Sequence, residues 1–98
     1  MATVPVHLVL FGRARELANL TEKNINIPRV LNYRQLRQLI FHEALFFPLL
    51  LSFIVKELSP IEKYCMLALN QEYIDDHNDT FTINPHSEIA IIPPINGG

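Results

Sequence analysis

The last six residues of the chain are the stretch most suited to chemistry: Pro93-Pro94-Ile95-Asn96-Gly97-Gly98. Two of the three glycines in the whole chain stand at its end. Because proline lacks an N–H donor and holds φ at about −65°, the proline pair favours a stiff, extended segment that projects the end away from the body. The glycines carry no side chain, so their backbone can enter a narrow channel. The sequence therefore predicts a tail that presents the Gly98 carboxylate to a partner's active site, where it can be activated as an acyl adenylate.

The other residue types that often do chemistry form no matching pattern. No Ser/His/Asp or Cys/His arrangement suggests a nucleophile on this chain. The four histidines lack the spacing and the cysteine companions of a metal site, and the acidic residues in 75–79 lack the glycine and distal glutamate of a calcium loop. Cys65 lies in an apolar stretch, which predicts a buried structural thiol. We therefore expect no metal and no bound cofactor.

Composition limits the class of protein. The chain has 98 residues, of which 49% are apolar and 18% charged, so one folded domain is expected. A single cysteine allows no internal disulfide and favours a reduced, intracellular setting. The longest apolar run, residues 44–55, is shorter than the ~18 residues that cross a bilayer, and the first basic residue follows the apolar start rather than preceding it. A cytoplasmic protein without a membrane partner is expected.

Charge is distributed unevenly along the chain, with a net charge of −2. Residues 1–40 carry six basic and two acidic side chains, whereas residues 41–98 carry two basic and eight acidic ones. No basic run or arginine pattern interleaved with aromatic residues occurs, so nucleic-acid binding has little support. The acidic second half is also poorly suited to binding an anionic phosphate without help.

Hydrophobic periodicity predicts the first half of the fold. Alternating residues in 4–11 indicate a strand, and residues 24–27 indicate a second strand that pairs with it as a hairpin. One or two helical turns are expected over 13–20. Asn32 followed three residues later by Gln35 is typical of a capping box, and apolar residues at helical spacing after it predict an amphipathic helix that covers one face of another element.

The second half of the chain predicts short strands joined by turns. A turn is expected at Asn70-Gln71, and the extended pieces are residues 65–69, 72–74, 80–83 and 88–92. Two strands, a helix and further strands predict an α+β domain, a mixed sheet with a helix packed on one face. This order matches the ubiquitin-like β-grasp fold.

Three stretches resemble one particular family of β-grasp carriers. They are residues 9–17 (VLFGRAREL), 70–74 (NQEYI) and, above all, 88–98 (EIAIIPPINGG). A terminal Gly-Gly is shared by all β-grasp carriers, whereas an acidic residue, an apolar strand, Pro-Pro and Gly-Gly together form a much narrower signature. On these motifs the chain resembles the small, sulfur-carrier subunits of molybdopterin synthase.

The resemblance implies a β-grasp domain over residues 1–92 and a flexible, sulfur-carrying tail over 93–98. An E1-like enzyme would use ATP to adenylate Gly98, and sulfur transfer would convert this residue to a thiocarboxylate (1-thioglycine). The tail would insert into the large synthase subunit and give its sulfur to a cyclic pterin phosphate precursor, which builds the dithiolene of molybdopterin. The catalytic groups would come from the large subunit, in a heterotetramer of two small and two large subunits.

The expected docking residues lie near the root of this tail. Because the first and last strands of a β-grasp sheet are parallel neighbours, Phe11 and Ile92 are expected to lie together and to form either a partner patch or core. The family pattern adds an apolar contact at Tyr73 and a cation near the tail root at Arg15, which otherwise are a half-buried sheet residue and a solvated helix charge. The chain departs from the family at Gly12, where alanine is more common, and this change is expected to loosen the turn.

Three functions remain open from the sequence. The first is sulfur donation in molybdopterin synthesis. The second is a ubiquitin-like modifier that is conjugated to lysines, or a sulfur carrier for tRNA thiolation. The third is a non-catalytic β-grasp interaction module with an incidental ending. The apolar segment 44–55 is longer than the family pattern predicts, and extra core is the favoured interpretation over an added binding surface.

Overall fold

A computed structural model describes residues 2–42, 58–74 and 80–94. The apolar segment 44–55, the polar loop 75–79 and the tail residues Ile95, Asn96, Gly97 and Gly98 lie outside the described residues, and so do the predictions made for them. In the described part of the chain, no helix has the length and apolar character needed to cross a membrane. This part contains the sheet, its helices and the first two residues of the predicted tail.

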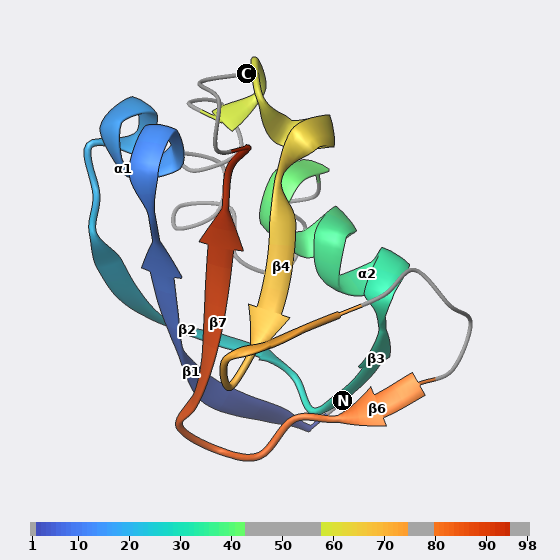
Figure 1. Ribbon diagram of the computed structural model, residues 1–98. Helices are drawn as coiled ribbons and strands as arrows, with labels where there is room; N and C mark the ends of the chain where they lie inside the picture. The colour runs from blue at the N-terminus through green and yellow to red at the C-terminus, as the bar shows by residue number, and fades with distance from the viewer. Residues whose placement is uncertain (1, 43–57, 75–79, 95–98) are drawn as a thin grey trace.

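The fold is built on a five-stranded mixed sheet in the order β2-β1-β7-β4-β5 (Figure 1). β1 (Thr3–Leu10) pairs antiparallel with β2 (Glu22–Pro28), which confirms the predicted hairpin-like pair. β7 (Ser87–Ile92) runs parallel to β1 on the other side. β4 (Met66–Leu69) is antiparallel to β7 and pairs with the edge strand β5 (Glu72–Tyr73). The last strand in the sequence is therefore the central strand of the sheet.

The predicted helix covers one face of this sheet (Figure 1). α2 (Tyr33–Arg37) begins with the expected capping box: the Gln35 N–H donates to Asn32 Oδ1 at 2.8 Å, and the Asn32 N–H donates to Gln35 Oε1 at 2.9 Å. The helix then widens into a π-helix, η1 (Gln38–His42). Residues 39–41 are all buried, so the wider turn brings three consecutive side chains into the core.

The core lies between α2 and the face of the sheet that α2 covers, here called the inner face. Alternate residues of β1, from Val4 to Leu10, point into it, as the period of two predicts. Leu67 of β4, Ile89 of β7 and Leu36 of α2 join the same cluster and are fully buried. Each such side chain contributes about 1.5–3 kcal/mol through the burial of apolar surface.

Arg37 ties α2 to the segment that leads into β4. Its Nη1 donates to the carbonyl oxygen of Cys65 at 2.8 Å, and its Nη2 donates to the carbonyl oxygen of Glu62 at 2.6 Å. The Glu62 carboxylate lies 3.2 Å from Nη2, and Glu62 belongs to the short 3₁₀ helix η2 (Glu62–Tyr64). The guanidinium carbon also lies 4.7 Å from the ring centroid of Phe41. One side chain therefore satisfies two backbone carbonyls and fixes the start of β4.

Smaller elements complete the described structure. α1 (Gly12–Ala18) confirms the helical turns expected after the first strand, and Asn19 caps its C-terminal end with a left-handed φ of 53°. Asn70 and Gln71 form the predicted turn between β4 and β5, both with positive φ. β3 (Val30–Asn32) pairs with β6 (Thr80–Thr82) in a second, two-stranded sheet. The sequence predicted no strand at β3, because three residues contain too little periodicity to identify one.

Candidate functional site

The root of the tail lies at the end of the central strand. β7 ends at Ile92, and Pro93 and Pro94 follow it, all three half-buried. Because β1 and β7 are parallel, their ends lie side by side, and the Phe11 N–H donates to the Ile91 carbonyl oxygen at 3.2 Å. This confirms the expected juxtaposition of Phe11 and Ile92 where the tail departs.

A groove of about 380 Å³ flanks the tail root. One wall is the turn from β1 into α1, and the other is the end of β7 with the two prolines; the lining residues are Phe11, Gly12, Arg13, Glu16, Ile92, Pro93 and Pro94. Arg13 and Glu16 form an exposed ion pair, with Nη1 and Oε1 3.7 Å apart. The groove is therefore mostly apolar and carries one charged pair at the α1 side.

The strand registers place a set of apolar residues on the face of the sheet opposite the core, here called the outer face. Ala90 of β7 pairs with Ala68 of β4, which in turn pairs with Tyr73 of β5. One step toward the tail, Ile92 pairs with Met66. Because side chains two residues apart share a face, these five residues lie on one side of the sheet, beside the tail root.

Met66 and Tyr73 of this set are exposed, and so is Phe11, which lines the tail-root groove together with Ile92. The exposed fractions are 46% for Phe11, 49% for Met66 and 62% for Tyr73. Ala68 and Ala90 are covered, yet neither belongs to the core cluster. The outer-face patch is defined as Phe11, Met66, Ala68, Tyr73, Ala90 and Ile92. A continuous apolar patch beside the chain's departure point is the arrangement expected of a protein contact surface.

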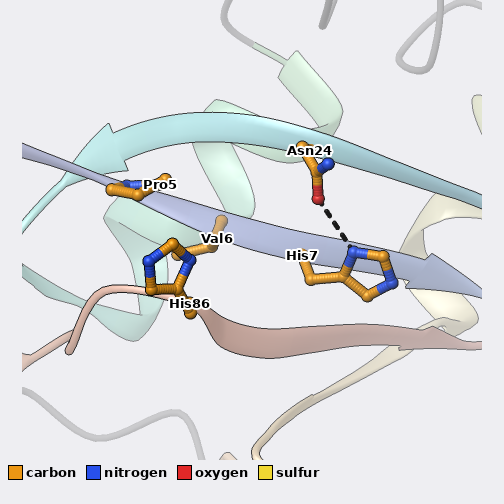
Figure 2. Close-up of a pocket in the computed structure, with 5 residues that line it drawn as sticks. All are labelled: Pro5, Val6, His7, Asn24 and His86. Carbon is orange, nitrogen blue, oxygen red and sulfur yellow. Dashed lines mark hydrogen bonds between the residues drawn. The ribbon is translucent and has the colours of Figure 1, made fainter.

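The opposite end of the outer face is polar (Figure 2). The His7 ring lies between two residues of β2: its Nδ1 is 2.9 Å from Asn24 Oδ1, and its Nε2 is 3.0 Å from Glu22 Oε1. A groove of about 370 Å³ runs past His7 and Asn24 toward His86, which precedes β7. The outer face thus changes from apolar at the tail root to polar at the start of β7.

The predicted docking residues occupy different parts of this surface. Phe11 and Ile92 line the groove at the tail root, and Tyr73 lies two strands away on the edge of the same face. Arg15 is exposed on α1, but the cation that lines the groove is Arg13. The structure therefore brings Phe11 and Ile92 together, places Tyr73 on their face and leaves Arg15 outside the groove.

Sequence reasoning missed Met66 as a surface residue. The stretch 65–69 is apolar throughout, so the sequence predicted a strand there without assigning its two faces. The signal was nevertheless present, because a period of two places Met66 and Ala68 on the face opposite Leu67. Gly12 was noted only as a departure from the family; the structure gives it a left-handed φ of 47° and sets it against Pro93.

Cys65 is a buried thiol, as predicted. Burial raises its pKa to about 11, and the nearby positive charge of Arg37 opposes this effect only in part. The thiol is therefore protonated at neutral pH and is a poor nucleophile. Among residues 2–42, 58–74 and 80–94, no group of three His, Cys, Asp or Glu side chains is placed to hold a metal ion.

Comparison with known proteins identifies the family. The model of the ThiS family matches residues 8–98, nearly the whole chain. The chain belongs to the ThiS family. Among its relatives, the molybdopterin synthase sulfur carrier subunit of Caenorhabditis briggsae is 36% identical over 95 residues, which cover 97% of this chain and 99% of that protein. The subunit of the same name from Drosophila yakuba is 30% identical, covering 97% and 92%.

Solved structures confirm the β-grasp fold expected for this ThiS-family chain. Molybdopterin converting factor subunit 1 from Pyrococcus furiosus superposes with a TM-score of 0.58 at 18% identity, covering 94% of this chain and 99% of that one. A chain in the complex of subunits 1 and 2 of the molybdopterin-converting factor from Helicobacter pylori gives 0.57 at 22% identity, covering 97% and 100%. The α+β, ubiquitin-like architecture is thus confirmed.

Proposed function

We propose that this ThiS-family chain is the sulfur carrier subunit of a molybdopterin synthase and that Gly98 carries the sulfur as a thiocarboxylate. The observation that carries the proposal is the position of the tail root. Pro93 and Pro94 continue the central strand of the sheet and leave it beside the outer-face patch. The names of the relatives from Caenorhabditis and Drosophila support the same function.

The body of the domain acts as a rigid holder for the tail. β7 pairs with β1 on one side and β4 on the other, so its end is fixed in position. The two prolines limit the backbone torsions that follow, since each fixes its own φ and restricts the residue before it. Because glycine has no side chain, a glycine pair beyond this stiff segment can enter a narrow channel in a partner, whereas bulkier residues could not.

The sulfur is carried by the backbone terminus, so the chain needs no reactive side chain. An E1-like enzyme joins the Gly98 carboxylate to the AMP part of ATP and releases pyrophosphate. Sulfide-level sulfur from a donor then attacks the carbonyl carbon, the bond to AMP breaks, and Gly98 becomes a thiocarboxylate. Transfer to the cyclic pterin phosphate precursor returns Gly98 to a carboxylate, whose new oxygen comes from water. Two loaded tails supply the two sulfurs of one dithiolene.

The partner is the large synthase subunit, in a heterotetramer of two small and two large subunits. The outer-face patch is the docking surface, with Phe11 and Ile92 at the tail root and Tyr73 at the far edge, and Arg15 is the predicted cationic contact. The large subunit supplies the acid–base groups and the cations that bind the phosphate. The chain is thus a non-catalytic, sulfur-donating subunit of a cytosolic enzyme.

A semisynthetic chain with a thiocarboxylate at Gly98 tests the proposal. It is mixed with a molybdopterin synthase large subunit and the pterin precursor, and the intact mass of the chain is recorded over time. We expect the mass to fall by the difference between sulfur and oxygen, and dithiolene product to appear in step.

The matched control is a chain that lacks Gly98 and carries its thiocarboxylate at Gly97. It has the same reactive group but reaches one residue less far, about 3.5 Å, so we expect it to bind and not to transfer. The proposal is wrong if the Gly98 thiocarboxylate persists with a large subunit that is active with its own carrier. Isopeptide-linked adducts of the chain in cells would then favour a protein modifier.

A further inference from the structure

We propose that Gly12 is a positioning residue that sets the direction in which the tail leaves the domain. The inference rests on the proposed function, because direction matters only if the tail must enter a partner. It starts from one contact: Gly12 lies in the turn from β1 into α1, and the Pro93 ring packs against it.

The contact is tight for a side chain at residue 12, and the Pro93 ring would have to move by a few tenths of an ångström to admit one. A Cβ built on Gly12 would lie 3.2 Å from Pro93 Cγ and 3.9 Å from Pro93 Cδ. The first distance is shorter than a comfortable carbon–carbon contact, so an alanine would push the proline ring away from the turn. The positive φ of 47° is a second obstacle, since residues with a Cβ rarely adopt it. In this chain, where residue 12 has a left-handed φ and contacts Pro93, glycine allows both the turn and the approach of the tail without strain.

The Pro93 ring is well placed to transmit this contact to the tail. Immediately before it, the backbone is fixed by the hydrogen bond from the Phe11 N–H to the Ile91 carbonyl oxygen. Immediately after it, Pro94 restricts the backbone of Pro93 to extended conformations. The ring therefore sits between a fixed strand and the restricted Pro93-Pro94 segment, and we expect its displacement to change the direction in which the chain leaves the domain.

A purely local role for Gly12 predicts a different result. If Gly12 served only the turn into α1, an alanine would strain that turn and lower stability without affecting the tail. Asn19 offers a matched control, because it has a left-handed φ of 53° at the other end of α1 and lies outside the groove of the tail root. Asn19→Ala introduces a similar backbone strain far from Pro93.

The test uses the full-length chain with a Gly98 thiocarboxylate and four variants: Gly12→Ala, Pro93→Ala, the double variant and Asn19→Ala. The readout is kcat/KM for sulfur transfer with the large subunit, at a temperature where thermal unfolding shows each variant to be folded. We expect Gly12→Ala to lower kcat/KM at least tenfold when Pro93 is present and less than threefold when residue 93 is alanine. Asn19→Ala should stay within twofold of the unchanged chain.

A second readout is independent of activity. The unchanged chain should give a nuclear Overhauser effect between the Gly12 Hα and Pro93 Hγ protons, and Gly12→Ala should lose the corresponding cross-peak. Absence of this effect in the unchanged chain would overturn the inference, and so would an equal loss of transfer from Gly12→Ala with either residue at 93. If the unchanged chain transfers no sulfur, the proposed function fails, while the Overhauser effect still decides whether Gly12 holds Pro93.

Discussion

The two faces of the central sheet are built from the same strands and differ in almost every other respect. The inner face is filled by fully buried aliphatic side chains, such as Leu8, Leu67 and Ile89, that pack under α2. The outer face carries Met66 and Tyr73, which are large, apolar and exposed. Met66 and Leu67 are adjacent in one strand, yet Leu67 is buried in the core and Met66 is exposed on the outer face.

The difference shows how a small domain separates stability from recognition. Burial of the inner face supplies the free energy that holds the fold. The apolar side chains of the outer face add little to the free energy of folding while they are exposed to water. They contribute to the free energy of binding when a partner covers them. The two tasks should therefore respond to different substitutions.

The largest expected effect is on the inner face. Leu67→Ala removes a fully buried side chain and should lower the free energy of unfolding by about 2–5 kcal/mol, since the core closes only in part over the cavity. Met66→Ala, one residue away, should change it by less than about 0.5 kcal/mol. Urea titrations of both variants measure the contrast. Equal losses would show that the outer face also holds the fold together.

Arg37→Ala tests the link that fixes the start of β4. The substitution leaves the carbonyls of Glu62 and Cys65 without their donor and the Glu62 carboxylate without its cation. We expect a loss of about 2–4 kcal/mol in the free energy of unfolding. Arg37→Lys keeps the positive charge but lacks the planar guanidinium group. Its free energy of unfolding should lie between those of the unchanged chain and Arg37→Ala. A lysine variant as unstable as the alanine variant would assign the effect to geometry rather than charge.

Cys65, which is buried in the core, makes the free energy of unfolding depend on pH. Its folded pKa of about 11 lies above the ordinary value of 9.0, so the thiol ionises more easily in the unfolded chain. Stability is therefore complete below pH 9 and falls as the pH rises to about 11, by up to about 2–3 kcal/mol. Unfolding titrations from pH 8 to 11 should show this loss in the unchanged chain. A Cys65→Ala variant with an identical profile would contradict the prediction.

The smallest effect on stability belongs to the outer face, where binding should change instead. Tyr73→Ala should alter the free energy of unfolding by less than about 0.5 kcal/mol, yet weaken binding to the large subunit about tenfold. Calorimetric titration measures the affinity. Val30→Ala is the matched control, because Val30 is exposed and apolar but lies on β3, in the other sheet. Equal weakening by both would remove the outer-face patch from the docking surface.

Much of this fold was readable from local signals. The capping box at Asn32 and Gln35, the first hairpin and the turn at Asn70 all form where short-range patterns predict them. These features depend on residues close in sequence, so the pattern alone contains the necessary information. The candidate tail was found in the same way, from composition over six residues.

The features that escaped prediction depend on contacts between distant parts of the chain. Arg37 meets Glu62 and Cys65 across 25 and 28 residues. Gly12 contacts Pro93, which lies at the other end of the chain. The sequence showed that glycine replaces the family's usual alanine at this position, but it did not show the contact with Pro93. Tertiary packing determines such contacts, and no hydrophobic periodicity or local sequence motif predicts them.

The position of β7 also has a mechanical consequence. A partner that grips the tail pulls along the axis of this strand, which is paired with β1 over five register positions and with β4 over four. Hydrogen bonds run across the strands, so such a force loads both ladders in shear, with the bonds resisting together rather than opening one by one. The tail can thus be drawn back out of a tight channel by the domain that holds it, without β7 separating from the sheet at the end that is pulled.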